Sequence, residues 1–333
     1  MKLKLGVVDQ SPVANGGTAA DAIAQTLQLA HICEDLGYSR YWLAEHHSTN
    51  SFAGSSPAVL IARVASVTER IRVGSGGVML SHYSPLQVAE NFRMLEAMFP
   101  GRIDLGVGRA PGGDGRTTLA LQYGRGGIGV DQYPAQVEHL TGWLTDGFEE
   151  PHPWRRVRAM PRAATVPELW MLGSGGSTAE YAARLSAGYS FAQFISGEDG
   201  APLMRRYHDR YQPDARSPQP RGNVALGVIC AETQAEAQRL AGSMEAWGRG
   251  IMRGQDRGIP SPEQALETLE PGWTPPPLGT DGARMIAGDP AQVRDELLRV
   301  AARYGVDEMM AVTVTHSFDA RVRSYELLAE ALL

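Results

Sequence analysis

Two kinds of hydrophobic pattern alternate along the whole chain. Short runs of β-branched and apolar residues predict buried strands, and longer segments with an apolar residue at every third or fourth position predict amphipathic helices. In the segment 20–33, apolar residues stand at positions 20, 23, 27, 30 and 33, which gives a helix one apolar face. The predicted strands are 3–8, 41–44, 71–76, 103–107, 168–172, 189–193, 224–231 and 308–314.

Capping residues mark where several of the predicted helices begin. Thr18 and Asp289 are suitable N-cap residues, and Pro290 stands at a first helical position, where its missing N–H costs no hydrogen bond. The segments 84–87 and 233–236 have the spacing of a capping box, in which two side chains satisfy two backbone N–H groups. These signals predict helices between successive strands.

Strands that are each followed by helical sequence, with no change of composition midway, predict a single (β/α)8 TIM-barrel domain spanning 1–333. We expect insertions after the fourth and seventh strands, where the connections are longest. The tract 250–282 in the second insertion is rich in glycine and proline and is a candidate lid. Trp273 within it either covers the pocket or packs locally. The main alternative, a doubly wound sheet, lacks the GxGxxG sequence expected after its first strand.

Composition narrows the class of protein. A hydrophobic fraction of 43% supports a sizeable core, and a net charge of −6 disfavours a nucleic-acid surface. The densest basic run, 155–158, is interpreted as a solvated loop. No run approaches the roughly 18 apolar residues that a membrane-spanning helix needs, so no membrane contact is expected. Cys33 and Cys230 lack metal-ligand spacing and are expected to be buried free thiols, which predicts a reducing, cytoplasmic location.

The loops after the strands build the active site in barrels, and Glu45-His46-His47 directly follows the second predicted strand. Histidines at such a position are packed or capping residues about as often as functional ones, so both interpretations stay open. Because adjacent residues at a strand end face opposite ways, at most one of His46 and His47 should point into the site. A histidine titrating near neutrality would suit proton transfer there. No HExxH sequence accompanies the pair, and no metal site is predicted.

Three glycine-rich clusters follow other strands. In 74–77 the glycines mark either a bend in the strand or the close approach of a flat ligand. Arg109 is flanked by glycines, and its guanidinium either lies on the surface or binds a phosphate or carboxylate. The segment 173–178 combines glycines and hydroxyl side chains before a predicted helix, whose N-terminus favours anions. Arg109 and 173–178 together predict one phosphate held between two neighbouring strand ends.

These segments, in this order and at these positions, resemble the bacterial-luciferase-like flavin-dependent monooxygenases, and the resemblance extends from residue 3 to about 330. It implies an enzyme that uses reduced FMN as a co-substrate with O2 and oxygenates a small organic molecule through a C4a-peroxyflavin. Gly108 stands where luciferase itself carries a cysteine, so light emission does not follow from the resemblance. The segments that carry the resemblance are 42–47, 76–80, 100–111, 171–175, 288–290 and 305–308.

The resemblance also implies roles for individual residues. His46 corresponds to the active-site histidine near the flavin C4a edge, and Arg109 to the arginine that binds the FMN phosphate. Gly76 and Gly77 correspond to a non-prolyl cis peptide beneath the isoalloxazine ring. The remaining implied cofactor contacts are Ser174, Gly175 and Thr178 in the phosphate-binding loop and helix start, and Phe194 beside the flavin.

Two other functions remain open on the same fold. One is hydride transfer with the deazaflavin F420, and the other is non-catalytic binding of FMN. The chain has no recognisable nicotinamide-binding motif, so we expect reduced FMN to come from a separate flavin reductase. The segment 59–67 has few charges, and Phe92, Met94, Met98 and Phe99 add more apolar surface than one barrel contact needs, which predicts a homodimer.

Overall fold

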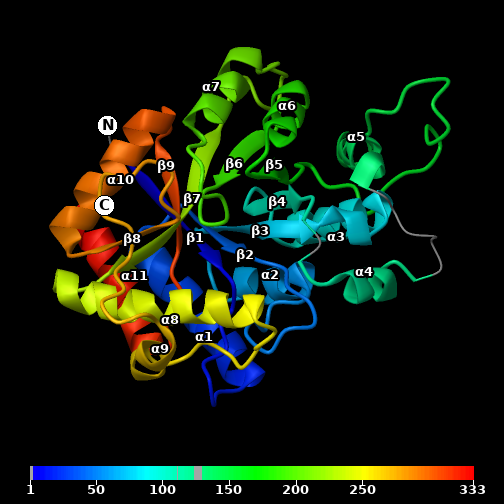
Figure 1. The fold of residues 1–333 in the computed structure, drawn as a ribbon. Helices are drawn as coiled ribbons and strands as arrows, with labels where there is room; N and C mark the ends of the chain where they lie inside the picture. The colour runs from blue at the N-terminus through cyan, green and yellow to red at the C-terminus, as the bar shows by residue number, and fades with distance from the viewer. Residues whose placement is uncertain (1–2, 111, 124–129) are drawn as a thin grey trace.

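The computed structural model describes residues 3–110, 112–123 and 130–333 and has the predicted (β/α)8 barrel architecture (Figure 1). Neighbouring strands pair in parallel around the barrel, and pairing of β6 with β7 closes it. The barrel strands are β1 (Lys4–Asp9), β2 (Arg40–Leu43), β3 (Arg72–Met79), β4 (Ile103–Gly108), β5 (Glu168–Gly173), β6 (Gly188–Ala192), β7 (Gly222–Cys230) and β9 (Glu308–Val312). The predicted fold class is therefore confirmed.

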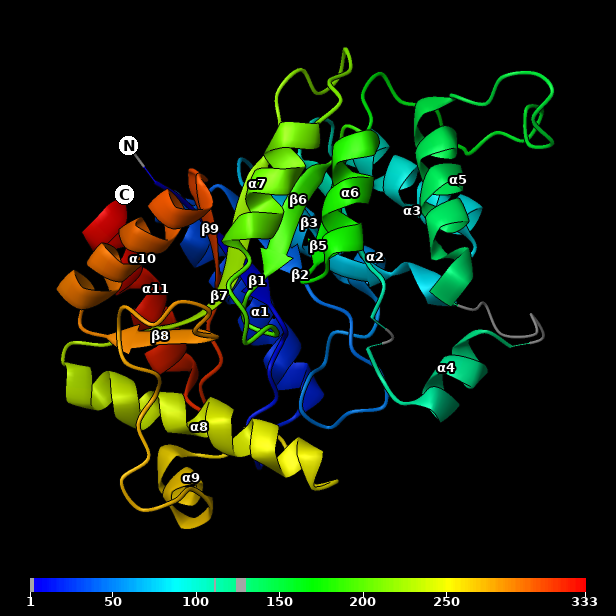
Figure 2. The same ribbon diagram turned by 45° about the horizontal axis from the view of Figure 1, so that its top comes forward.

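Helices surround the barrel in both views (Figures 1 and 2). Two short 3-10 turns, η1 (Leu80–His82) and η2 (Val130–Gln132), lie in the connections. The helices are α1 (Ala19–Asp35), α2 (Pro57–Ser66), α3 (Pro85–Met98), α4 (Gly115–Leu121), α5 (Tyr133–Thr145), α6 (Gly176–Arg184), α7 (Ala201–Arg210), α8 (Gln234–Met252), α9 (Pro262–Thr268), α10 (Pro290–Tyr304) and α11 (Phe318–Leu332).

The predicted capping signals form unequally. Thr18 and Asp289 each make a reciprocal capping box, and Thr233 accepts a hydrogen bond from the N–H of Glu236. The Ser84 side chain makes no capping hydrogen bond, so the box predicted there is wrong. A proline follows Ser84 in the first turn of α3 and presets the helical φ angle, which explains why the helix still begins at this position.

The segment between β7 and β9 differs most from the pattern-based expectation. A ninth strand, β8 (Met285–Gly288), pairs only with the end of β7 and extends the sheet beyond the barrel. The tract 250–282 is not irregular throughout, because α9 lies within it and begins with a capping box at Ser261. Trp273 packs between α8 and α9 near Gly242 and Ala265 and does not cover the barrel mouth.

A charged network closes the amino-terminal end of the barrel. The fully buried carboxylate of Asp104 accepts hydrogen bonds from Arg40 at 2.6 Å, Arg72 at 2.9 Å and the indole of Trp42 at 2.8 Å. The Arg40 guanidinium also lies 4.7 Å from the centre of the Trp170 ring. Buried charges that are fully hydrogen-bonded in this way hold a fixed geometry. The network therefore seals this end and leaves the carboxyl end for chemistry.

Side chains fill the barrel interior up to its carboxyl end. Trp42 and Trp170 meet edge to face with ring centres 5.2 Å apart, and Val8, Met310 and Val312 pack around them. The barrel is thus a packed core with no through channel in this layer, as is usual for eight-stranded barrels.

Cys33 of α1 and Cys230 of β7 are buried free thiols, as predicted. Among the described residues, none of the helices is both long and apolar enough to cross a membrane.

Candidate active site

The predicted site residues follow the carboxyl ends of adjacent strands. Strands β2, β3, β4, β5 and β6 are consecutive neighbours in the barrel, so the segments after them meet at one end. In Figure 2 the arrowhead of β6 points toward this end, which α4 and α8 flank. Residues 111 and 124–129 of the glycine-rich segment after β4 lie outside the described part of the chain.

Glu45 and His47 belong to a hydrogen-bond network that joins the ends of β2 and β3. The buried Glu45 carboxylate contacts the Nε2 atom of His47 at 2.7 Å and accepts from the Tyr83 hydroxyl at 2.7 Å and from the N–H of Met79 at 3.0 Å. The backbone N–H of His47 donates to the carbonyl of Gly112, in the loop that follows Arg109. These groups fix the loops and leave the Glu45 carboxylate fully engaged.

His46 is the histidine of the pair that remains available to a ligand. Its Nδ1 atom is buried without a hydrogen-bond partner among the described residues, and its ring packs 4.7 Å from that of Phe52. Unpaired buried polar atoms are rare and often mark positions completed by a ligand. The two adjacent histidines therefore have different surroundings, as the alternation at a strand end predicts.

The expectation that this histidine titrates near neutrality is wrong. Burial, and to a smaller extent the neighbouring His47, lower the pKa of His46 from 6.5 to about 4. The physical reason is that the imidazolium loses its hydration, while the Glu45 carboxylate that could compensate is turned toward His47. His46 is therefore neutral at pH 7, with one ring nitrogen as a donor and the other as an acceptor.

The glycines at the end of β3 are required by the barrel itself. The peptide bond between Gly76 and Gly77 is cis, as the resemblance implies. A Cβ atom on Gly76 would lie 2.9 Å from Cβ of Trp42, and one on Gly77 would lie 2.9 Å from the carbonyl oxygen of Gly106. These clashes give a third explanation beside the bend and the flat ligand, because close packing of the strands requires the glycines even without a ligand.

A candidate anion site lies where β4 and β5 end, and it is called the cradle below. Gly175 is the N-cap of α6, its helix has no side-chain cap, and a Cβ atom on Gly175 would meet nothing within 4 Å. The N–H groups of the first turn of α6 thus face open space, which favours a negative charge. Thr178 lies in this turn, and its side chain packs closely on Gly173. A Cβ atom added to Gly173 would lie 2.9 Å from Oγ1 of Thr178. Arg109, with an exposed side chain, follows the neighbouring strand β4.

Tyr133 was not identified from the sequence but belongs with this cradle. Its hydroxyl is buried without a partner among the described residues. Burial raises the pKa of the Tyr133 phenol, the charge of Arg109 opposes that shift, and Tyr181 of α6 adds to it, so these groups lie close together. A tyrosine at a helix start has no distinctive spacing, and only the fold brings it to β4 and α6.

An aromatic wall stands beside His46. The Trp247 ring of α8 lies 4.9 Å from the Phe52 ring, and the Nε1–H of Trp247 is buried without a partner among the described residues. Phe194, which follows β6, packs with Trp247 and Leu172 against the upper layer of the barrel interior. Phe52 and Trp247 were missed from the sequence because they lie far apart in a loop and a helix.

Three chain segments form a small sheet above this wall. Val13 donates its N–H to the carbonyl of Ser51, and Ile259 donates its N–H to the carbonyl of Val13, both at 2.8 Å. The Asp256 carboxylate fixes the third segment by accepting from the N–H of Asn50 at 2.5 Å and from the Ser51 hydroxyl. Residues 256–259 of the candidate lid tract therefore form part of this small sheet.

The described residues form a (β/α)8 barrel whose candidate site lies at the carboxyl ends of its strands. A family model described as luciferase-like monooxygenase matches residues 3–308. The chain belongs to this family and is a flavin-dependent oxidoreductase.

Individual relatives agree over nearly the whole length. The chain is 44% identical to an uncharacterized protein of Bacillus subtilis, YwcH, over 99% of both chains. It is 36% identical to the N-acetyl-S-alkylcysteine monooxygenase of Bacillus subtilis, over 99% of this chain and 98% of the relative. A solved structure, that of apo-MsnO8, superposes with a TM-score of 0.90 at 39% identity and covers 99% of both chains.

More distant structures share the fold alone. They include an FMN complex of the oxygenating constituent of 3,6-diketocamphane monooxygenase, at 17% identity and a TM-score of 0.67. They also include an F420-dependent secondary alcohol dehydrogenase, at 14% identity and a TM-score of 0.69. Both cofactor classes thus occur on this fold.

Proposed function

We propose that the protein is an FMN-dependent monooxygenase that uses reduced FMN and O2 to oxygenate a small organic substrate. The observation that carries the proposal is the cradle formed by Arg109, the Tyr133 hydroxyl and the open N-terminus of α6, which suits the phosphate of a flavin. The family relative that is a named monooxygenase favours FMN over F420.

In this proposal the guanidinium of Arg109 and the backbone N–H groups at the start of α6 bind the phosphate. The hydroxyls of Ser174, Thr178 and Tyr133 complete its hydrogen bonds, and the backbone at Gly175 leaves room for it. The segment with the cis peptide at Gly76 supports the ring system from below. Reduced FMN, when bound, supplies the activation of O2.

His46 acts as a neutral hydrogen-bonding group. Its buried, unpartnered Nδ1 atom is available to the cofactor or the substrate, and the imidazole can donate or accept a proton at that atom. The Glu45–His47 network holds the loop in place, because the backbone of the intervening His46 is fixed on both sides. The apolar rings of Phe52 and Trp247 beside His46 exclude water, which limits wasteful release of hydrogen peroxide.

The substrate occupies the space beside the aromatic wall. Phe52, Trp247 and Phe194 present apolar surfaces there, and the unpartnered Nε1–H of Trp247 adds one hydrogen-bond donor. A predominantly apolar molecule with one acceptor atom fits this combination, because such a donor is costly to leave buried and unpaired.

The oligomer and the electron source complete the proposal. Phe92 lies in the core, but Val59 of α2 and Met94 and Met98 of α3 are 71%, 51% and 50% exposed, which supports a homodimer through these helices. A monomer in sedimentation equilibrium at micromolar concentration would contradict this. The reductase that supplies reduced FMN is a separate protein in this proposal, and the compartment is the cytoplasm.

A titration under anaerobic conditions tests the proposed cofactor. Purified protein is mixed with FMN, reduced FMN, oxidised F420 and reduced F420, and binding is followed by absorbance and fluorescence. We expect reduced FMN to bind, and the complex to consume O2 when air is admitted. Preferential binding of F420 with no O2 consumption would instead support the hydride-transfer enzyme, and FMN binding without reaction would support a non-catalytic flavoprotein.

A further inference from the structure

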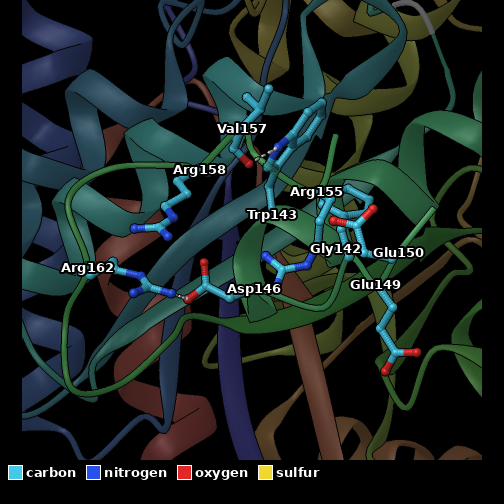
Figure 3. Close-up of a pocket in the computed structure, with 10 residues that line it drawn as sticks. Gly142, Trp143, Asp146, Glu149, Glu150, Arg155, Val157, Arg158 and Arg162 are labelled. Atoms are coloured by element: carbon cyan, nitrogen blue, oxygen red, sulfur yellow. Dashed lines mark hydrogen bonds and ion pairs between the residues drawn. The ribbon is translucent and has the colours of Figure 1, made fainter. Parts of the chain in front are cut away.

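A second cavity, far from the barrel mouth, lies at the other end of α5. Its volume is about 500 Å³, and its walls are the last turns of α5 and the loop that follows, as Figure 3 shows. Tyr133 starts α5 beside the proposed flavin phosphate site, and α5 is 13 residues long. At about 1.5 Å per residue the cavity is roughly 20 Å away along the helix, so it is not part of the flavin site.

Arginines of the loop that follows α5 line the cavity together with the acidic residues Asp146, Glu149 and Glu150. Arg155, Arg158 and Arg162 all line it, and Figure 3 shows them surrounding the same space. Asp146 is the acidic group that is paired there, and it contacts Arg162 at 2.9 Å and the buried Arg93 at 3.2 Å.

Two of the arginines have no acidic partner in the described part of the chain. Neither Arg155 nor Arg158 forms an ion pair with a carboxylate there, even though Glu149 and Glu150 also line the cavity. In Figure 3 the carboxylate of Glu149 points away from the guanidinium groups.

The cavity wall is held by contacts that do not involve these arginines. The indole of Trp143 donates to the carbonyl of Val157 at 3.2 Å, which ties the loop to α5. Phe148 stacks on the ring of His152 with centres 4.3 Å apart. Buried Arg93 donates to the carbonyl of Trp143 at 2.8 Å and holds the end of the helix. The walls should therefore persist when Arg155 or Arg158 is replaced.

We propose that this cavity is a binding site for a small organic anion with at least two negative charges, carried by phosphate or carboxylate groups. Guanidinium groups match the paired oxygens of both, and Arg155 and Arg158, which have no ion-pair partner in the described part of the chain, are available to bind them. The volume exceeds that of an inorganic phosphate, and Trp143 and Val157 provide an apolar wall for the organic part. The basic run 155–158 is thus the wall of a site and not only a solvated loop.

Calorimetric titration of the full chain with inorganic pyrophosphate tests this site. All proteins carry Arg109→Ala, which removes the cationic side chain of the flavin phosphate cradle. The test variant adds Arg155→Gln and Arg158→Gln. The matched control adds Arg156→Gln, which removes the same kind of charge from the same loop but does not line the cavity. Circular dichroism and thermal unfolding verify that every variant is folded.

We expect one pyrophosphate per chain for the parent, which carries only Arg109→Ala, and for the Arg156→Gln control. The double variant with Arg155→Gln and Arg158→Gln should bind pyrophosphate at least tenfold more weakly. Citrate in place of pyrophosphate shows whether carboxylates serve as well as phosphates. Equal binding by all three proteins, or no binding by the parent at low ionic strength, overturns the proposal. A change of oligomeric state in the double variant with unchanged anion binding also overturns it, because the arginines then pair with a second copy of the chain.

Discussion

His46 and His47 are adjacent residues with different partners, and their substitution should have different consequences. His46→Ala removes the ring whose Nδ1 atom has no partner among the described residues, so FMN binding should be nearly unchanged. We expect the yield of oxygenated product per O2 to fall by about tenfold or more, with hydrogen peroxide released instead. His47→Ala is the control, because it leaves the Glu45 carboxylate short of a partner and should lower stability by about 1–3 kcal/mol. Unchanged product yield in His46→Ala would assign this residue to packing.

Burial of His46 also predicts a pH dependence of stability. Its folded-state pKa is about 4, against 6.5 for an ordinary histidine, so the unfolded chain binds a proton that the folded chain rejects between these values. The contribution of His46 to the free energy of unfolding is therefore complete above pH 6.5 and is lost as the pH falls toward 4, by about 2 kcal/mol at pH 5. Urea unfolding should show that the free energy of unfolding falls less between pH 7 and pH 5 for His46→Gln than for the unchanged protein. Equal losses would show that His46 titrates normally in the folded state.

Arg109 and Tyr133 can be tested by comparing two flavins that differ only in the phosphate. Arg109→Ala should weaken FMN binding by about ten- to a hundredfold, since a charged hydrogen bond contributes roughly 1.5–3 kcal/mol, and should leave riboflavin binding nearly unchanged. Tyr133→Phe should also weaken FMN binding, but less than Arg109→Ala does, because it removes one neutral hydroxyl. Equal losses for FMN and riboflavin would contradict the assigned phosphate site.

At the scale of elements, the small sheet above the aromatic wall should control access to the site. Asp256→Ala removes the carboxylate that fixes 256–259 to Asn50 and Ser51, so amide hydrogen exchange in these segments should rise. More water would then reach the site, and peroxide release should increase. Arg257→Gln is the matched control, because this neighbouring exposed side chain forms no such link to the 50–51 segment. Equal hydrogen exchange in the two variants would show that the small sheet does not depend on Asp256.

The elements themselves differ in how well the sequence predicts them. The barrel strands follow from continuous apolar runs, because strands buried on both faces are hydrophobic along their whole length. β8 and α9 were missed, since both are short and lie in a tract whose glycines and prolines hide the capping box at Ser261. Phe52, Tyr133 and Trp247 were missed for another reason: each comes from a different segment, and only barrel closure brings them to one end.

At the scale of the whole molecule, the order of strands determines what can meet at the site. The predicted site residues lie at one end of the barrel because β2 to β6 are neighbours, so segments that follow consecutive strands converge. The protonation state of His46 could not be predicted in this way, because it depends on burial and on the orientation of Glu45. The arginine-lined cavity at the other end of α5 likewise becomes visible only when the loop after α5 is folded back onto the helix.

The proposed activity is the transfer of one oxygen atom from O2 to an organic molecule, at the expense of reduced FMN. The most direct measurement mixes the protein and chemically reduced FMN with ¹⁸O₂ and a panel of apolar molecules that carry one hydrogen-bond acceptor, such as ketones, thioethers and amides. Mass spectrometry should find a product with one ¹⁸O atom, formed in no more than a one-to-one ratio to FMN and absent without protein. The proposed monooxygenase activity is contradicted by two results together. Every panel member remains unlabelled and all consumed ¹⁸O₂ appears as hydrogen peroxide, and reduced F420 transfers hydride to a panel ketone without O2.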